Sequence, residues 1–172
     1  PQHLDENTKQ TLIDLYKKAN KRTLILDYDG TLAPFRDRMA KPEDSLLKTL
    51  STLINGGTDI SILSGRDRKD LEAFFGKLPI TLVAEQGTFV KKPHQNWVDT
   101  MGYVDTSFKR EVKKILEIYK DRAPEAFVEE EEYSIVFHYR SVPDEIAEPL
   151  SKELYMILTE ITSNVEANVI NI

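Results

Sequence analysis

Apolar residues recur at two spacings along the first hundred residues of the chain. The spacing of three or four residues that is typical of amphipathic helices covers residues 7–19 and 42–55. The short apolar runs that indicate strands cover residues 23–28, 59–63 and 80–84. Asp67 is placed to cap a further short helix that Gly76 closes. This alternation of strand and helix predicts a parallel α/β sheet, and the stretch that follows, 85–98, is expected to form a hairpin.

The second part of the chain has a different pattern. Helices are expected over residues 104–122 and 144–163. Between them, residues 126–140 form two strands or one long bent strand, and residues 165–172 are expected to form a last strand. These elements predict an α+β module, so the chain divides near residue 103 into parts 1–103 and 104–172.

Composition narrows the class of protein. Hydrophobic residues make up 40% and charged residues 30% of the 172 residues, which is typical of a soluble globular protein. No apolar run is long enough to span a bilayer, and no signal peptide is recognisable, so we expect neither membrane insertion nor export. The chain has no cysteine, which excludes disulfides and thiolate metal sites and fits a cytoplasmic location. A net charge of -6 argues against nucleic acid as a partner.

Two carboxylates follow the first predicted strand. In "LILDYDGTLAP", Asp27 and Asp29 leave the strand on one side while Tyr28 points away. At the carboxyl end of a parallel strand, where ligands bind, they repel each other unless one takes a proton or Mg²⁺ binds. One carboxylate can attack phosphorus, and a protonated carboxyl can donate to a leaving oxygen. Gly30 permits a sharp turn and Thr31 adds a hydroxyl, although a plain Asp-Gly turn is the simpler interpretation.

The second predicted strand also ends in groups that suit phosphate. Ser64 offers a hydroxyl, the backbone from Gly65 onward offers N–H groups, and Arg66 offers a charged fork. A phosphoryl group in transfer needs such donors on its oxygens. The alternative is an ordinary Ser-Gly turn followed by a surface arginine.

These two stretches resemble signatures of the haloacid dehalogenase superfamily. "DYDGTL" is similar to the first signature and "DISILSGR" to the second. The resemblance implies that Asp27 is the nucleophile and Asp29 the general acid/base. It also implies a Mg²⁺ cofactor held by the Asp27 carboxylate and the backbone carbonyl of Asp29, so both residues count as metal ligands.

Further stretches resemble the trehalose-6-phosphate phosphatase family, in the style of the phosphatase domains of eukaryotic trehalose-phosphate synthase/phosphatase proteins. They are "LYKKANKRTLILDYDGTLAP", "SGR", "AEQGTFVKKPHQNWV" and "FVEEEEYSIVFHYRSVP". The resemblance implies a Rossmann-like core with a small α/β cap. It implies hydrolysis of trehalose 6-phosphate through an aspartyl-phosphate, within trehalose biosynthesis, with a synthase subunit or domain as a partner.

The resemblance also assigns substrate residues to the cap, with two departures. Glu129 and Glu131 occupy the positions of a Glu and a Lys that contact trehalose in the family, so a glutamate replaces a cation. His138 and Arg140 belong to the "HYR" string. Gln86 stands where the family usually has His. The simpler interpretations are a solvated acidic edge at 129–132, a structural His138 and a surface Arg140.

The superfamily needs two more signatures, a lysine and an acidic Mg²⁺-binding loop, which the resemblance would place after Ile172. The core is therefore expected to lack its last strands, and the 172-residue form to be weakened or inactive. Two alternatives stay open: a shortened phosphatase, or a non-catalytic regulatory or scaffolding domain of a trehalose-synthesis complex. A phosphatase for another phosphosugar, such as sucrose phosphate, is a third.

Overall fold

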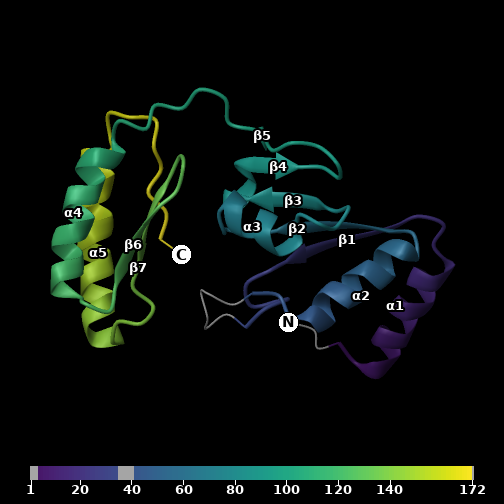
Figure 1. Cartoon of the computed structure of the whole chain (residues 1–172). Coiled ribbons are helices and arrows are strands. Elements are labelled where there is room, and N and C mark those ends of the chain that lie inside the picture. The colour runs from purple at the N-terminus through teal and green to yellow at the C-terminus, as the bar shows by residue number, and fades with distance from the viewer. Residues whose placement is uncertain (1–3, 35–40, 172) are drawn as a thin grey trace. The chain divides into compact units, whose positions relative to one another are not determined.

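The structure is a computed structural model that describes residues 4–34 and 41–171. Backbone contacts divide the chain into two compact units, Pro1–Thr100 and Met101–Ile172 (Figure 1). Each unit buries apolar side chains of its own.

The first unit is built on a mixed sheet. Its strands are β1 (Arg22–Asp27), β2 (Thr58–Leu63), β3 (Thr81–Ala84), β4 (Phe89–Lys91) and β5 (Val98–Asp99), in that spatial order. The first three strands are parallel, as predicted, and β4 and β5 continue the sheet as the expected antiparallel hairpin. Asp27 pairs in register with Leu63, and Leu63 with Val83, so the carboxyl ends of the three parallel strands are level.

The helices of this unit lie where their periodicity predicts them. They are α1 (Glu6–Lys18), α2 (Asp44–Asn55) and α3 (Arg68–Phe75). The short 3₁₀ helix η1 (Glu85–Gly87) was not predicted and lies at the start of the stretch expected to form the hairpin. The Asp67 side chain accepts the N–H of Asp70 and so caps α3. Helix α2 contacts β2, and α3 contacts β3.

Two expectations about burial are wrong for the described residues. Strand β1 alternates between half-buried and exposed positions, and Ile25 is 69% exposed instead of buried. Helix α1 has no buried residue, and Leu12 and Leu15, which its periodicity places on one apolar face, are 52% and 62% exposed. On the face of the sheet that carries Ile25, Leu63 of the neighbouring strand β2 is also 39% exposed, so the described residues leave this face open to solvent.

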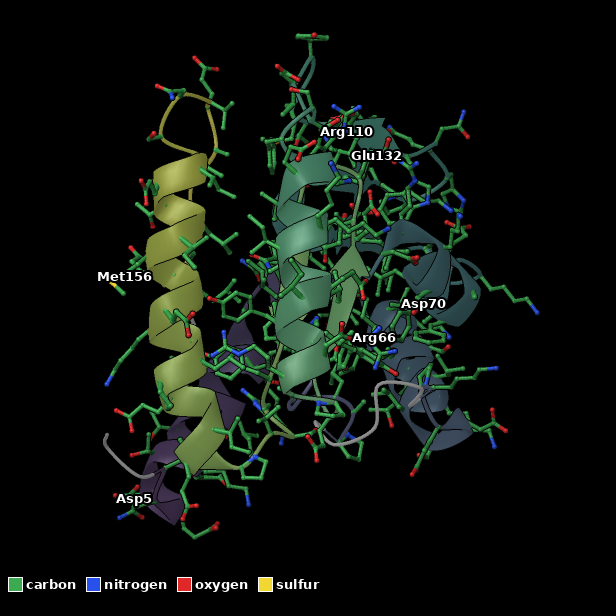
Figure 2. The ribbon with its side chains drawn as sticks, turned by 90° about the vertical axis from the view of Figure 1, so that its left-hand side faces the viewer. Asp5, Arg66, Asp70, Arg110, Glu132 and Met156 are labelled. Carbon is green, nitrogen blue, oxygen red and sulfur yellow. The ribbon has the colours of Figure 1, made fainter. Side chains whose placement is uncertain are left out.

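The second unit is a two-stranded sheet against two helices. It contains α4 (Lys109–Arg122), β6 (Phe127–Glu130), β7 (Ile135–His138) and α5 (Asp144–Ile161), so the alternative with two strands is the correct one. Figures 1 and 2 show α4 and α5 side by side, and the two helices are in contact. Val128, Ile135 and Phe137 pack against the buried residues of the helices. The alternate residues of the strands therefore face away from the helices.

Three boundaries in this unit differ from the prediction. Helix α4 begins at Lys109 instead of 104, because the Asp105 side chain accepts the N–H of Ser107 and stabilises a turn there. Helix α5 ends at Ile161. The last strand expected over 165–172 is absent over its described part, 165–171, where no backbone of a neighbouring strand pairs with it. There the Tyr139 hydroxyl donates to the side-chain oxygen of Asn171, 2.6 Å away.

Candidate active site

The loop after β1 folds tightly around the carbonyl of Tyr28. This carbonyl accepts the N–H groups of Thr31, Leu32 and Ala33, at 3.3, 2.9 and 3.0 Å. Gly30, with φ of 87°, donates its N–H to the Ala33 carbonyl over 2.8 Å. None of these four bonds uses the carbonyl of Asp29, which leaves that oxygen outside the network of the turn.

Asp27 ends β1 with an exposed side chain. The Thr31 hydroxyl donates to its Oδ2 over 3.0 Å. The turn thus brings Thr31 to the first aspartate, and this bond orients the carboxylate.

Asp29 is bound by the side chain of Arg66. The Arg66 Nε lies 3.1 Å from Oδ1 and 3.0 Å from Oδ2 of Asp29, and Nη2 lies 2.7 Å from Oδ1. The Arg66 side chain is only 9% exposed and that of Asp29 is 31% exposed. The hydrogen bonds to Asp29 are the main cause of a raised pKa of Arg66.

Aromatic rings hold the Arg66 guanidinium in place. Its carbon lies 5.1 Å from the centre of the Tyr28 ring and 5.6 Å from that of Phe74, which is within the range of cation–π attraction. Tyr28 is fully buried, and this burial raises the pKa of its hydroxyl. Asp70, on α3, lies 3.9 Å from Arg66 Nη1 (Figure 2).

Ser64 is buried between the same groups. Its hydroxyl accepts the backbone N–H of Arg66 over 3.1 Å and makes a long bond of 3.4 Å to Oδ2 of Asp29. Gly65, which follows, is exposed. The structure therefore brings Asp29, Ser64 and Arg66 into one network, and Asp27 and Thr31 into a neighbouring one.

The sequence did not reveal an unusual backbone conformation after β3. Glu85, Gln86 and Gly87 all have positive φ, of 48°, 55° and 108°. Glu85 and Gln86 donate their N–H groups to the carbonyls of Arg66 (3.0 Å) and Ser64 (3.3 Å), which ties this turn to the end of β2. Positive φ is costly for residues other than glycine, and only the single glycine in "EQG" hints at it.

The predicted cap residues lie in the second unit. Glu129 and His138 are on the side of β6 and β7 that faces away from the helices, and Glu129 Oε2 lies 2.7 Å from His138 Nε2. The ring of Phe127 stacks on that of His138, with 4.3 Å between their centres. Glu131 accepts a hydrogen bond from the Ser134 hydroxyl in the turn between the strands, and Arg140 is exposed beyond β7.

The acidic run 129–132 is more ordered than a solvated edge. Glu130 lies 2.7 Å from Lys113 Nζ and 3.3 Å from Lys109 Nζ, both on α4. These lysines lower the pKa of Glu130, Lys113 most.

In the part of the chain that the structure describes, no group of three or more His, Cys, Asp or Glu side chains could hold a metal ion. No helix among the described residues is long and apolar enough to cross a membrane.

Comparison with known proteins assigns the chain to a family. The sequence profile of the trehalose-phosphatase family matches residues 25–170. A bifunctional trehalose-6-phosphate synthase/phosphatase of Thermoproteus tenax is 39% identical over 155 residues, which cover 88% of this chain and 21% of that protein. A trehalose-phosphatase of Saccharomyces cerevisiae is 34% identical over 169 residues, covering 95% of this chain and 19% of that protein.

A solved structure supports the same assignment. The C-terminal domain of a Candida albicans trehalose-6-phosphate phosphatase superposes with a TM-score of 0.82 at 29% identity, covering 90% of this chain and 55% of that one. The chain thus spans about a fifth of the length of the two curated relatives and just over half of the solved domain. The predicted α/β architecture and the resemblance to the trehalose-6-phosphate phosphatase family are confirmed, and this chain belongs to the trehalose-phosphatase family.

Proposed function

We propose that this chain carries the nucleophile and the phosphate-binding part of a Mg²⁺-dependent phosphatase that releases phosphate from trehalose 6-phosphate. The observation that carries the proposal is that two neighbouring carboxylates, those of Asp27 and Asp29, lie in different surroundings. Asp27 is exposed and oriented by one hydroxyl, while Asp29 is held by a guanidinium and a buried serine. Two acids in different surroundings suit two roles, a nucleophile and a proton carrier.

The residues fit a magnesium ion at the end of β1. Mg²⁺ is commonly held by one or two carboxylates, with waters and phosphate oxygens completing its shell. The exposed Asp27 carboxylate and the Asp29 carbonyl, which the turn leaves unused, are suitable oxygen ligands. Bound there, the ion would neutralise charge on the phosphoryl oxygens.

The chemistry then falls to this chain's own groups. Asp27 attacks phosphorus, the bond from phosphorus to the sugar oxygen breaks, and Asp29 gives that oxygen a proton. Asp29 afterwards takes a proton from the water that hydrolyses the aspartyl-phosphate. The Ser64 hydroxyl and the N–H groups near Gly65 hold the phosphoryl oxygens, and Thr31 keeps Asp27 oriented.

The two parts 1–103 and 104–172 take the roles of core and cap in this proposal. Glu129, oriented by His138, is proposed to bind a sugar hydroxyl, and the exposed Arg140 beyond β7 is proposed as a further contact of the sugar. Glu131 cannot offset the charge of a phosphate as the family's lysine does, so another phosphosugar is the competing substrate. The names of the relatives favour trehalose 6-phosphate as the substrate and a trehalose-phosphate synthase as the partner.

A second candidate function is a catalytically silent regulatory or scaffolding domain. The glutamate at position 131 favours it, since that residue occurs where the family uses a cation. Retained binding to a trehalose-phosphate synthase without any phosphate release would support this alternative.

The test is phosphate release by the 172-residue chain with Mg²⁺ and three substrates: trehalose 6-phosphate, sucrose 6-phosphate and glucose 6-phosphate. We expect weak turnover of the first, and we expect Asp27→Asn to abolish it. Asp59→Asn, an exposed acid on β2, is the matched control and should leave turnover unchanged. Release that persists in Asp27→Asn would reject the mechanism, and no release from any substrate would favour the regulatory alternative.

A further inference from the structure

We infer that Arg66 is a positioning residue that sets the orientation of Asp29. The inference deepens the proposed function and rests on it, because it matters for catalysis only if Asp29 carries the proton. It differs from a role for Arg66 as a direct ligand of the substrate's phosphate.

The first reason is the geometry of the contact between the Arg66 guanidinium and the Asp29 carboxylate, a fork of two nitrogens on one carboxylate. Two nitrogens of Arg66 are directed at the two oxygens of a single carboxylate, with distances of 2.7 to 3.1 Å. Bidentate pairs of this kind are strong and set direction as well as distance. The donors Nε and Nη2 are therefore committed to Asp29.

The second reason is that Arg66 itself is held on several sides. Tyr28 and Phe74 lie against its guanidinium, and Asp70 lies near the remaining terminal nitrogen, Nη1. Its backbone N–H donates to Ser64, and its carbonyl accepts the N–H of Glu85. The Arg66 side chain is 9% exposed and held on several sides, so it is rigid. It can keep Asp29 in one orientation but cannot readily move to contact a ligand.

The consequence for catalysis is that Ser64 and Arg66, which follow β2, have different roles. Ser64 is proposed to face the phosphoryl group, whereas Arg66 keeps the Asp29 carboxyl group aimed at the atoms between which it moves a proton. A lysine would keep the positive charge but could not form the fork. The substitution Arg66→Lys therefore separates the effect of the positive charge from the effect of the two-nitrogen contact with Asp29.

The first experiment needs no enzymatic activity. We expect the Nε–H proton of Arg66 to give a distinct NMR signal, protected from exchange, in the unmodified chain. Asp29→Asn should remove that protection. The Nε–H of Arg68, whose guanidinium stacks over Phe89 at 4.0 Å, is the matched reference and should not change. An unprotected Arg66 signal, or one that is insensitive to Asp29→Asn, would overturn the inference.

The second experiment separates positioning from phosphate binding. Arg66→Lys should lower kcat by about 100-fold, with KM within about twofold, because misplacing a catalytic group acts on the chemical step. Phe74→Leu, which removes one wall of the guanidinium site, should lower kcat by about 2–5-fold. Arg68→Lys is the control and should keep both constants. A raised KM with kcat retained in Arg66→Lys would show that Arg66 binds phosphate instead.

The outcomes keep the two proposals apart. If the unmodified chain releases no phosphate, the proposed activity fails, and the NMR experiment alone decides whether Arg66 orients Asp29. Circular dichroism checks that Arg66→Lys is folded; if it is not, the smaller change Phe74→Leu carries the kinetic test, and an unchanged kcat in that variant would count against the inference.

Discussion

Glu129 and His138 are diagonal neighbours on the antiparallel strands β6 and β7, with 2.7 Å between Glu129 Oε2 and His138 Nε2. An ionised carboxylate can only accept, so the imidazole nitrogen is the donor. The His138 ring is also stacked on Phe127. Glu129 is therefore held in one orientation by a neighbouring strand.

This contact predicts a stepwise loss of stability in the second unit. His138→Phe keeps a ring on Phe127 but removes the hydrogen bond, which should cost about 1 kcal/mol. His138→Ala also removes the ring pair and should cost about 0.5–1.5 kcal/mol more. Hydrogen exchange of the β6 and β7 amides measures both changes. Equal protection in the two variants would show that the stacked ring contributes nothing.

The charge at position 131 should control affinity for a phosphosugar. Replacing Glu131 by Lys restores the cation of the family pattern, so we expect trehalose 6-phosphate to bind about 10-fold more tightly. Calorimetric titration of the chain measures this affinity. Glu132→Lys makes the same charge change at an exposed neighbour. A similar gain in affinity there would show that the effect comes from the net charge of the chain and not from position 131.

The ion pair of Glu153 with Arg122 should make the stability of the second unit depend on pH in the acid range. Arg122 donates to both of its carboxylate oxygens, at 3.1 and 2.9 Å, and this contact lowers the pKa of Glu153 from 4.5 to about 2. Because the pKa is lower in the folded chain, the pair stabilises the fold above pH 4.5, and this contribution is lost as the pH falls towards 2. Melting temperatures across that window should fall less steeply for Glu153→Gln. Arg122→Gln should flatten the curve in the same way, and a slope unchanged in both variants would contradict this assignment.

Gly76 has no room for a side chain at the end of α3. A Cβ atom there would lie 2.4 Å from Oε1 and 2.5 Å from the carbonyl oxygen of Glu72. Gly76→Ala should therefore cost about 1–3 kcal/mol in the first unit. Trp97, which donates to Oε2 of the same glutamate over 2.9 Å, provides a local fluorescence signal for unfolding in urea.

The glycine that ends α2 is the matched control for this substitution. A Cβ at Gly56 would meet the carbonyl oxygens of Leu53 and Thr52 only at 3.4 Å. Gly56→Ala should change the free energy of unfolding by no more than about 0.5 kcal/mol. Similar costs at both positions would mean that the contact with Glu72 is not the cause.

The sequence predicted the elements well wherever the signal was local. Apolar spacing located the helices α2 and α3 and the strands β1–β3, and Asp67 and Gly76 marked the ends of α3. The strings around Asp27 and Ser64 indicated the family that the comparisons confirm. These features depend on neighbouring residues in the chain, so a single sequence contains them.

Features that depend on distant partners were not predictable. Ile25 reads as a buried residue, but its exposure depends on whether something covers that face of β1. Residues 165–171 have a strand-like composition, yet a strand forms only beside another backbone. Asp29 and Arg66 are 37 positions apart, so nothing local to either residue shows that the fork binds that carboxylate.

The exposed side of β1 has a practical consequence for handling the chain in solution. This strand has a neighbour on one side only within the described sheet, and Ile25 and Leu63 present apolar surface beside it. A free strand edge next to an apolar face is adhesive towards other chains. Dilute protein and early light-scattering measurements are therefore needed before any kinetic constant can be ascribed to single molecules.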